Sequence, residues 1–349
     1  MCAVAAAPVF VDVDTGVDDA IALIYLLASP DADIVGIAST GGNVGVDQVC
    51  KNNLGLLDVC RVDGVPVSRG ADPSNAAALT VSPVHGPRGL GYADLPATDR
   101  QLSGDDAATA WIRAAHQYPG ELIGVATGPL TNLALALRQE PALPTLLRRL
   151  VIMGGVYDYR GNTSPVSEWN IAFNPEAAAE VFAAWSPDAA QQVGPRHLPI
   201  LCGLDVTRQI AITPDILSDL AAAANSTTTA LSVSDERGTR SSASNPLIRV
   251  IEDATRFYLE SYYDRGHGYL AHLHDPLAAA VALDPQLVDT RQATVDVETT
   301  GTLTRGMTVT DWSGRWGRKP NALIAVDADS TRFFDRFVER VGSFAARLV

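Results

Sequence analysis

Lysine is almost absent from this sequence. Among 349 residues only Lys51 and Lys319 are lysines, and 40 acidic residues outnumber 26 basic ones, which gives a formal net charge of −14. A surface with this charge repels polyanions, so neither nucleic acid nor an anionic membrane is expected as a partner. Phosphate-handling enzymes normally recruit basic side chains, and the sequence contains no G-x-G-x-x-G, no G-x-x-x-x-G-K-[ST] and no serine nucleophile elbow.

Cysteines are few, and none forms a C-x-x-C pair. The four are Cys2, Cys50, Cys60 and Cys202, whose scattered positions predict buried thiols in a reducing compartment. No apolar run approaches the roughly 20 residues of a membrane span. The N-terminal segment lacks basic residues and runs straight into a predicted strand, so a signal peptide is not expected. These features predict a cytoplasmic protein.

Apolar strand-like segments alternate with helix-like segments along most of the chain. Hydrophobic residues make up 47% and charged residues 19%, a balance typical of globular proteins. Most strand-like segments end in small or polar residues just before a helix, which predicts an α/β fold with a mainly parallel central sheet flanked by helices, a Rossmann-like open sheet. With neither repeats nor a clear linker, residues 1–349 are predicted to form a single domain.

Four carboxylates lie within eight residues where the first strand meets the first helix, in the segment VFVDVDTGVDDAIALIYLL at 9–27. They are Asp12, Asp14, Asp18 and Asp19. Acids in the first turn of a helix gain about 0.3–1 kcal/mol each, whereas two unit charges about 4 Å apart repel by about 4 kcal/mol at an effective dielectric constant of 20. The carboxylates are therefore protonated, point apart, or hold a cation, and oxygen ligands favour Ca²⁺ or Mg²⁺. The alternative is that these are ordinary helix-start and turn-capping acids.

Other polar residues follow the ends of later strands. Asn43 follows the strand predicted at 33–39, Thr127 follows the one at 121–126, and a polar loop at 155–170 follows the one at 150–153. Ligands of parallel α/β sheets bind beyond the carboxyl ends of the strands, so these residues are expected to meet Asp14 there. Their Asp, Asn and Glu side chains suit a ligand rich in hydroxyl groups, such as a sugar, and a bound metal could activate a water beside it.

The second half of the chain contains a Ser/Thr-rich segment and several further elements. Residues 225–246 are predicted to form a mobile surface loop, and 71–104 a second long loop. Helices are predicted at 246–263 and 330–348 and a final strand at 322–326. A hairpin is predicted at 305–316 with its turn at Ser313-Gly314.

Seven segments resemble the motifs of one known family. They are DVDTGVDDAIAL at 12–23 with Gly42-Asn43, VHGPRGL at 84–90, ATGPLTNLALAL at 126–137, MGG at 153–155, GNTSPVSEWN at 161–170, HDPLAAA at 274–280 and RGMTVTDWSGRWGRKPN at 305–321. In order and spacing the chain resembles, over nearly its whole length, the nucleoside hydrolases of the inosine–uridine-preferring type. The resemblance implies calcium-dependent hydrolysis of the N-glycosidic bond of purine and/or pyrimidine ribonucleosides to free base and ribose, for salvage. It also implies a homodimer or homotetramer.

The same resemblance implies a role for each matching residue. Ca²⁺ would be held by three side chains and one backbone carbonyl: Asp14, Asp19, Asp275 and the carbonyl of Thr127. Asp14 would also deprotonate the attacking water. The ribose would be bound by a second set: Asp18, Asn43, Asn170 and Asp275 at the 2′- and 3′-hydroxyls, Asn162 and Glu168 at the 5′-hydroxyl, and Met153 under the sugar. His274 would protonate the leaving base, with His85 near the base and a tyrosine (Tyr258, Tyr262 or Tyr269) as a relay.

Two alternatives and three departures from the family pattern stay open. Asp12-Val13-Asp14 begins like the first motif of haloacid-dehalogenase phosphohydrolases, but Gly16 stands where that motif has Thr or Val. The other alternative is a non-catalytic, calcium-dependent sugar-binding protein. The 225–246 segment is longer than usual, which leaves base preference open, Asn174-Pro175 replaces the commoner Asp-Pro, and Arg208 stands where a histidine is common.

Overall fold

A computed structural model describes residues 6–71, 82–187 and 197–349 of the chain. Its strands are β1 (Ala7–Val13), β2 (Ala32–Ser39), β3 (Val67–Arg69), β4 (Leu122–Ala126), β5 (Leu147–Met153), β6 (Ile200–Cys202), β7 (Ala211–Ile212), β8 (Ala271–His272), β9 (Val288–Val297), β10 (Thr308–Asp311) and β11 (Ala322–Ala328). Its α-helices are α1 (Val17–Ala28), α2 (Val46–Val59), α3 (Ala107–Gln117), α4 (Thr131–Gln139), α5 (Leu143–Leu146), α6 (Trp169–Phe173), α7 (Pro175–Ala184), α8 (Leu204–Thr207), α9 (Pro214–Ala223), α10 (Pro246–Asp264), α11 (His274–Leu283) and α12 (Ser330–Arg347). Short 3-10 helices occupy Pro83–His85 and Pro285–Leu287.

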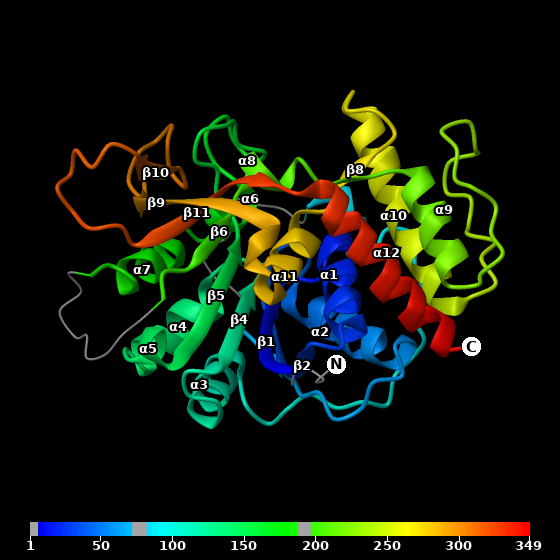
Figure 1. Cartoon of the computed structure of the whole chain (residues 1–349), viewed down its shortest axis with the longest axis horizontal. Coiled ribbons are helices and arrows are strands. Elements are labelled where there is room, and N and C mark those ends of the chain that lie inside the picture. The colour runs from blue at the N-terminus through cyan, green and yellow to red at the C-terminus, as the bar shows by residue number, and fades with distance from the viewer. Residues whose placement is uncertain (1–5, 72–81, 188–196) are drawn as a thin grey trace.

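One large sheet forms the centre of the molecule (Figure 1). Its strand order is β10-β9-β11-β6-β5-β4-β1-β2-β3. Neighbours from β11 to β3 pair in parallel, and only the pairs of β9 with β10 and with β11 are antiparallel. The predicted α/β class with a mainly parallel sheet is confirmed.

Helices cover both faces of the sheet. Alternate side chains of β1 pack against the helices on opposite faces. Val9, Val11 and Val13 pack in the apolar layer that contains α1, α11 and α12, whereas Phe10 packs in the layer of α3, α4 and α7 (Figure 1). Successive strand side chains point to opposite faces, so the apolar residues of β1 contribute to both layers. The parallel strands in turn deliver their carboxyl ends, and the residues after them, to one edge.

The prediction of a hairpin at 305–316 is wrong. β10 pairs instead with the preceding strand β9, in the register Thr308 to Val297. The Asp311 carboxylate accepts hydrogen bonds from the backbone N–H groups of Ser313, Arg315 and Trp316, which curls the chain after β10 and leaves no returning strand beside it. β9 was not predicted because its residues 289–292 are exposed and polar, so it lacks an apolar run.

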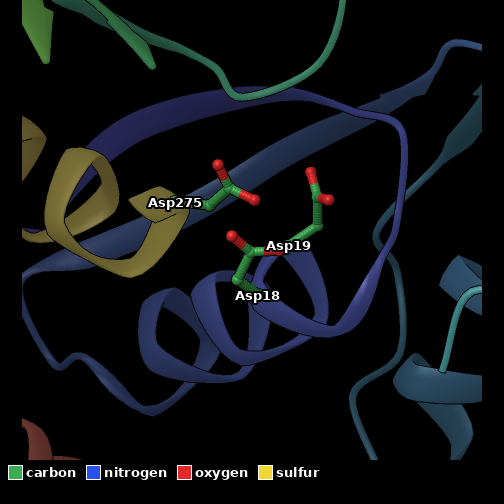
Figure 2. A group of neighbouring side chains, drawn as sticks. All are labelled: Asp18, Asp19 and Asp275. Carbon is green, nitrogen blue, oxygen red and sulfur yellow. The ribbon is translucent and has the colours of Figure 1, made fainter. Parts of the chain in front are cut away.

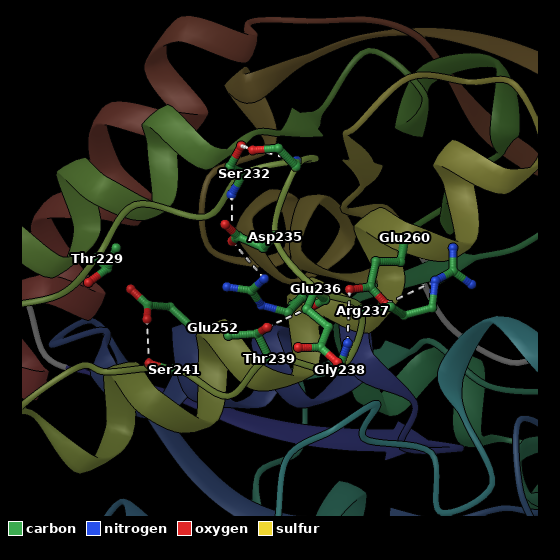
Figure 3. Close-up of polar contacts among 12 residues, drawn as sticks. Thr229, Ser232, Asp235, Glu236, Arg237, Gly238, Thr239, Ser241, Glu252 and Glu260 are labelled. Atoms are coloured by element: carbon green, nitrogen blue, oxygen red, sulfur yellow. Dashed lines mark hydrogen bonds and ion pairs between the residues drawn. The ribbon is translucent and has the colours of Figure 1, made fainter.

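The Ser/Thr-rich segment 225–246 lies along α10 and is tied to it by polar contacts (Figure 3). Thr228 and Ser241 donate hydrogen bonds to the buried carboxylate of Glu252, and Arg256 forms an ion pair with Asp235. The mobility of this segment stays a prediction. Of the long loop predicted at 71–104, residues 72–81 lie outside the described part of the chain.

Two features bear on the compartment prediction. Cys50, Cys60 and Cys202 are buried free thiols, and burial raises the pKa of both Cys60 and Cys202 to about 12; Cys2 lies outside the described residues. Among the helices that the structure describes, none is long and apolar enough to cross a membrane.

Candidate active site

Two glycines, Gly42 and Gly128, pack against the turn after β1 so closely that neither position has room for a side chain. A Cβ atom on Gly42 would lie 2.1 Å from Oδ2 of Asp14, and one on Gly128 would lie 2.9 Å from the backbone nitrogen of Asp14. The backbone N–H of Asn43 donates a 2.7 Å hydrogen bond to the same Asp14 oxygen. The glycines after β2 and β4 thus allow three strand ends to close around one carboxylate.

Asp19 is fixed by the start of helix α1 and by the end of β4. Its Oδ2 accepts a hydrogen bond from the backbone N–H of Gly16 at 2.9 Å and from Nδ2 of Asn43 at 3.2 Å. Its Oδ1 accepts one from Oγ1 of Thr127 at 2.7 Å. A carboxylate in the first turn also faces the positive end of the helix dipole, which suits the negative charge.

A third segment brings another carboxylate to the same place. Asp275 lies in the first turn of α11, which packs alongside α1. Oxygen atoms of Asp18, Asp19 and Asp275 all lie within 4.8 Å of one another, and Figure 2 shows these three side chains converging from the two helices. Residues more than 250 positions apart in the sequence therefore form one acidic cluster.

Burial and mutual repulsion make this cluster costly in the absence of a cation. Desolvation raises the pKa of Asp14, Asp18, Asp19 and Asp275, that of Asp18 to about 8, and neighbouring aspartates raise the pKa of Asp14, Asp18 and Asp275 further. Oδ1 of Asp14 is buried and has no hydrogen-bond partner among the described residues. Clustered carboxylates with a free buried oxygen are the ligand set that a hard divalent cation requires.

Asp12 does not belong to this cluster. Its carboxylate accepts hydrogen bonds from Nε1 of Trp111 at 2.8 Å and from Nδ2 of Asn132 at 2.9 Å. These contacts tie β1 to α3 and α4, on the opposite face from the apolar layer of α1. Asp12 is thus a structural residue, and its burial raises its pKa to about 7.

A pocket of about 620 Å³ opens directly above the acidic cluster. Every residue assigned above to substrate binding lines it, together with both histidines and Thr127: Asp18, Asn43, His85, Thr127, Met153, Asn162, Glu168, Asn170, His274 and Asp275. Asp14 and Asp19 do not line the pocket, because both are fully buried beneath its floor. The placement agrees with the expected site, and the role of each residue stays a prediction.

Glu168 organises the wall contributed by the loop after β5. Its carboxylate accepts hydrogen bonds from the backbone N–H groups of Asn170, Ile171 and Gly155, which caps the short helix α6. Burial nevertheless raises the pKa of Glu168 to about 7. Nδ2 of Asn170 donates to the backbone carbonyls of Thr127 at 2.6 Å and Met153 at 3.1 Å, so this wall is joined to the ends of β4 and β5.

The two histidines are buried and hydrogen-bonded within the protein. Nδ1 of His85 accepts a 3.1 Å hydrogen bond from the backbone N–H of Val17, and desolvation followed by Arg265 lowers the pKa of His85 to about 3. His274 contacts Oγ1 of Thr207 through Nδ1 at 2.7 Å and the hydroxyl of Tyr262 through Nε2 at 3.2 Å. Burial, then nearby positive charge, lowers its pKa as well. His274 therefore has the hydroxyl partner that a proton relay needs.

Sequence reasoning missed two residues that shape the other wall. Asp205 accepts hydrogen bonds from the backbone N–H groups of Tyr157 and Asp158 and so anchors the loop after β5. Tyr159 lines the pocket beside Arg208, whose guanidinium carbon lies 4.8 Å from the centre of the tyrosine ring. No local pattern marks these residues, because their partners are distant in sequence.

Comparison with known proteins agrees with this site. The family model described as inosine-uridine preferring nucleoside hydrolase matches residues 9–335. The chain is 34% identical over 343 residues to the pyrimidine-specific ribonucleoside hydrolase RihA of Citrobacter koseri, covering 98% of this chain and 100% of that protein. It is 35% identical over 339 residues to the same enzyme of Salmonella arizonae, covering 96% and 98%. Among solved structures, a purine-preferring ribonucleoside hydrolase from Gardnerella vaginalis aligns with a TM-score of 0.83 and 30% identity, covering 97% of this chain and 99% of that one.

The fold and site therefore define a hydrolase that acts on N-glycosyl bonds. The chain belongs to the inosine-uridine preferring nucleoside hydrolase family. This confirms the resemblance found in the sequence and removes both alternatives, the haloacid-dehalogenase phosphohydrolase and the non-catalytic sugar-binding protein.

Proposed function

We propose that this enzyme is a calcium-dependent ribonucleoside hydrolase that releases free base and ribose for salvage. The observation that carries the proposal is the position of the acidic cluster, beside the unpartnered Asp14 oxygen and directly beneath a pocket lined by Asp, Asn and Glu side chains. Asp14, Asp19, Asp275 and the carbonyl of Thr127 would hold Ca²⁺, and Asp18 lies close enough to contribute. When bound there, the cation would act as a Lewis acid that helps to anchor the ribose diol and lowers the pKa of a water.

The remaining roles in the proposal are those that the family resemblance implies, and the positions of the side chains in and beneath the pocket support them. Asp14 takes a proton from the attacking water, and its burial keeps its carboxylate more basic than an exposed one. Asp18, Asn43, Asn170 and Asp275 bind the 2′- and 3′-hydroxyls. Asn162 and Glu168 bind the 5′-hydroxyl, and Met153 packs under the sugar. The surrounding carboxylates stabilise the positive charge that develops on the ribose as the N-glycosidic bond breaks.

His274 and His85 are proposed to serve the base. His274, with Tyr262 hydrogen-bonded to it, would pass a proton to a leaving purine, and His85 would contact the base plane. The named relatives include both pyrimidine-specific and purine-preferring enzymes, so the proposal covers ribonucleosides of both kinds. A cytoplasmic location and a homodimer or homotetramer belong to the same proposal.

The direct test is to incubate the pure protein with uridine, cytidine, inosine and guanosine in the presence of Ca²⁺ and to assay free ribose. We expect release from at least one of these nucleosides. If none yields ribose, the proposed function is wrong.

Asp14→Asn provides the residue-specific test. We expect kcat to fall by about 10²–10⁴-fold, because the base is lost while the shape of the side chain is kept. Circular dichroism should show an unchanged fold. The matched control is Asp33→Asn, which makes the same substitution on an exposed residue of β2. A near-normal rate in Asp14→Asn would refute the role of Asp14 as the base.

A further inference from the structure

Arg208 follows the short helix α8 and lines the pocket on the side of the two base-facing histidines. The residue before it, Thr207, holds Nδ1 of His274. Arg208 also acts electrostatically on this part of the pocket. Burial lowers the pKa of His272 and His274, and the positive charge of Arg208 lowers both further. Burial raises the pKa of Tyr262, and the charge of Arg208 opposes that rise. Arg208 thus lines the same part of the pocket as His274.

The guanidinium of Arg208 is held in place by an aromatic ring, but no carboxylate of the described residues pairs with its charge. One face stacks on Tyr159, at 4.8 Å from the ring centre, and Nε is buried without a hydrogen-bond partner among the described residues. No carboxylate in the described part of the chain forms an ion pair with it. The other arginines that line the pocket, Arg160 and Arg265, are exposed. No side-chain hydrogen bond of Arg208 is found among the described residues, so its guanidinium can donate to an acceptor that enters the pocket.

The reaction creates such a partner. When the bond from C1′ to the base nitrogen breaks, its electron pair remains on the base, and the water oxygen forms the new bond to C1′ while Asp14 takes the water proton. In a pyrimidine the negative charge spreads from the ring nitrogen to the carbonyl oxygen on the adjacent carbon. In adenine no carbonyl oxygen is available. The pyrimidine anion is then protonated by solvent water as it leaves.

We propose that Arg208 donates a guanidinium N–H to this carbonyl oxygen, stabilises the departing pyrimidine anion, and so sets a preference for uridine and cytidine over adenosine. This inference rests on the proposed function and adds the class of base to it. A charge-assisted hydrogen bond that strengthens as negative charge develops raises kcat more than it lowers KM. Arginine keeps its charge throughout, so this contact adds no proton transfer of its own.

The experiment compares the variants on substrates whose leaving groups differ in how much stabilisation they need as the bond to C1′ breaks. Arg208→Gln and Arg208→Lys are assayed with uridine, 5-fluorouridine, adenosine and 4-nitrophenyl β-D-ribofuranoside, whose leaving group departs readily by itself. The matched control is Arg291→Gln, which removes another arginine stacked on an aromatic ring, 4.7 Å from the centre of Trp312 and outside the pocket.

We expect Arg208→Gln to lower kcat for uridine by about 100-fold, the effect of losing one hydrogen-bond donor to a developing anion. The loss should be smaller for 5-fluorouridine, whose base is a better leaving group, and less than about threefold for adenosine and the nitrophenyl riboside. Arg208→Lys should regain part of the rate on uridine, because it restores the charge without the planar fork. The control should behave as the wild type.

Two outcomes would overturn the inference. An equal loss on all four substrates would show that Arg208 supports the fold or the ribose, and an unchanged rate on uridine would show that the base does not contact it. Should Arg208→Gln not fold, Tyr159→Leu removes the ring beneath the guanidinium from an exposed position and must show the same dependence on the leaving group. If the wild type cleaves the nitrophenyl riboside but favours adenosine over uridine, the inference fails while the proposed function stands.

Discussion

At the scale of single residues, Glu168 shows how one side chain serves both the fold and the site. Three backbone N–H groups favour its carboxylate form, yet its complete burial outweighs them and raises its pKa from 4.5 to about 7. The sequence marked Glu168 through its motif, but only the structure shows that it caps α6. The contribution of Glu168 to the free energy of unfolding therefore depends on pH.

Glu168→Gln should reveal that dependence. A carboxyl group with a raised pKa binds its proton more tightly in the folded state, so its contribution to stability is fully present below pH 4.5 and is lost as the pH rises to about 7. Across this interval the free energy of unfolding of the wild type should fall relative to the variant by up to about 3 kcal/mol. Urea unfolding of both proteins at pH 5, 6, 7 and 8 measures the difference, and a constant difference would contradict the assignment.

Arg208 marks the limit of prediction at this scale. The sequence singled it out only as a departure from a family pattern, and no neighbouring residue explained it. Its interpretation depends on Tyr159, which comes from a different loop, and on the lack of a partner for its Nε among the described residues. Contacts of this kind are set by tertiary packing, which local sequence patterns do not encode.

At the scale of elements, the sequence predicted the buried parallel strands and most helices but not the edge of the sheet. β4, most of β1 and the second half of β5 are apolar runs that end in glycine or polar turns, as expected for strands buried on both faces. The antiparallel strands β9 and β10 are partly exposed and have weaker hydrophobic patterns, so their pairing was missed. The strand ends that form the site belong to the predictable part, which explains why the acidic cluster could be anticipated.

The segment 225–246 provides the prediction at this scale. Glu252 on α10 is 2% exposed and accepts hydrogen bonds from Thr228 and Ser241, on the two sides of the segment. Figure 3 shows the contact between Glu252 and Ser241. Glu252→Ala leaves both hydroxyls without this partner and should lower the free energy of unfolding by about 1–3 kcal/mol. Hydrogen–deuterium exchange should rise in peptides covering residues 226–244.

The control for the loop is Asp264→Asn, which removes the exposed ion pair with Arg237 on the same segment. Exposed pairs contribute about 0–1 kcal/mol, so exchange should change little in this variant. Equal exchange in the two variants would mean that the segment is not held by Glu252. α10 also supplies Tyr258 and Tyr262 to the pocket, so loosening this segment should change KM for nucleosides more than it changes the fold.

At the scale of the whole molecule, the acidic cluster and the neighbouring Asp14 bring the start of the chain together with α11, more than 250 positions later in the sequence. Asp14 and Asp19 come from the first strand and helix, while Asp275 comes from α11, and repulsion among these buried carboxylates opposes their approach. A divalent cation that binds the folded state alone offsets this repulsion. Its stabilisation is about 2.7 kcal/mol when the free cation is at 100 times its Kd.

Calcium should therefore raise the unfolding temperature of the wild type, and a chelator should lower it. Asp19→Asn should show little of this calcium-dependent shift, because it removes a ligand charge, whereas Asp33→Asn should retain it in full. Thermal unfolding at increasing Ca²⁺, repeated with Mg²⁺, measures both the affinity and the choice of ion. A cation that bound only a surface patch would stabilise Asp19→Asn as much as the wild type. Loss of the shift in Asp19→Asn alone would place the ion where α1 and α11 meet, so that one cation both closes the fold and prepares the site for ribose.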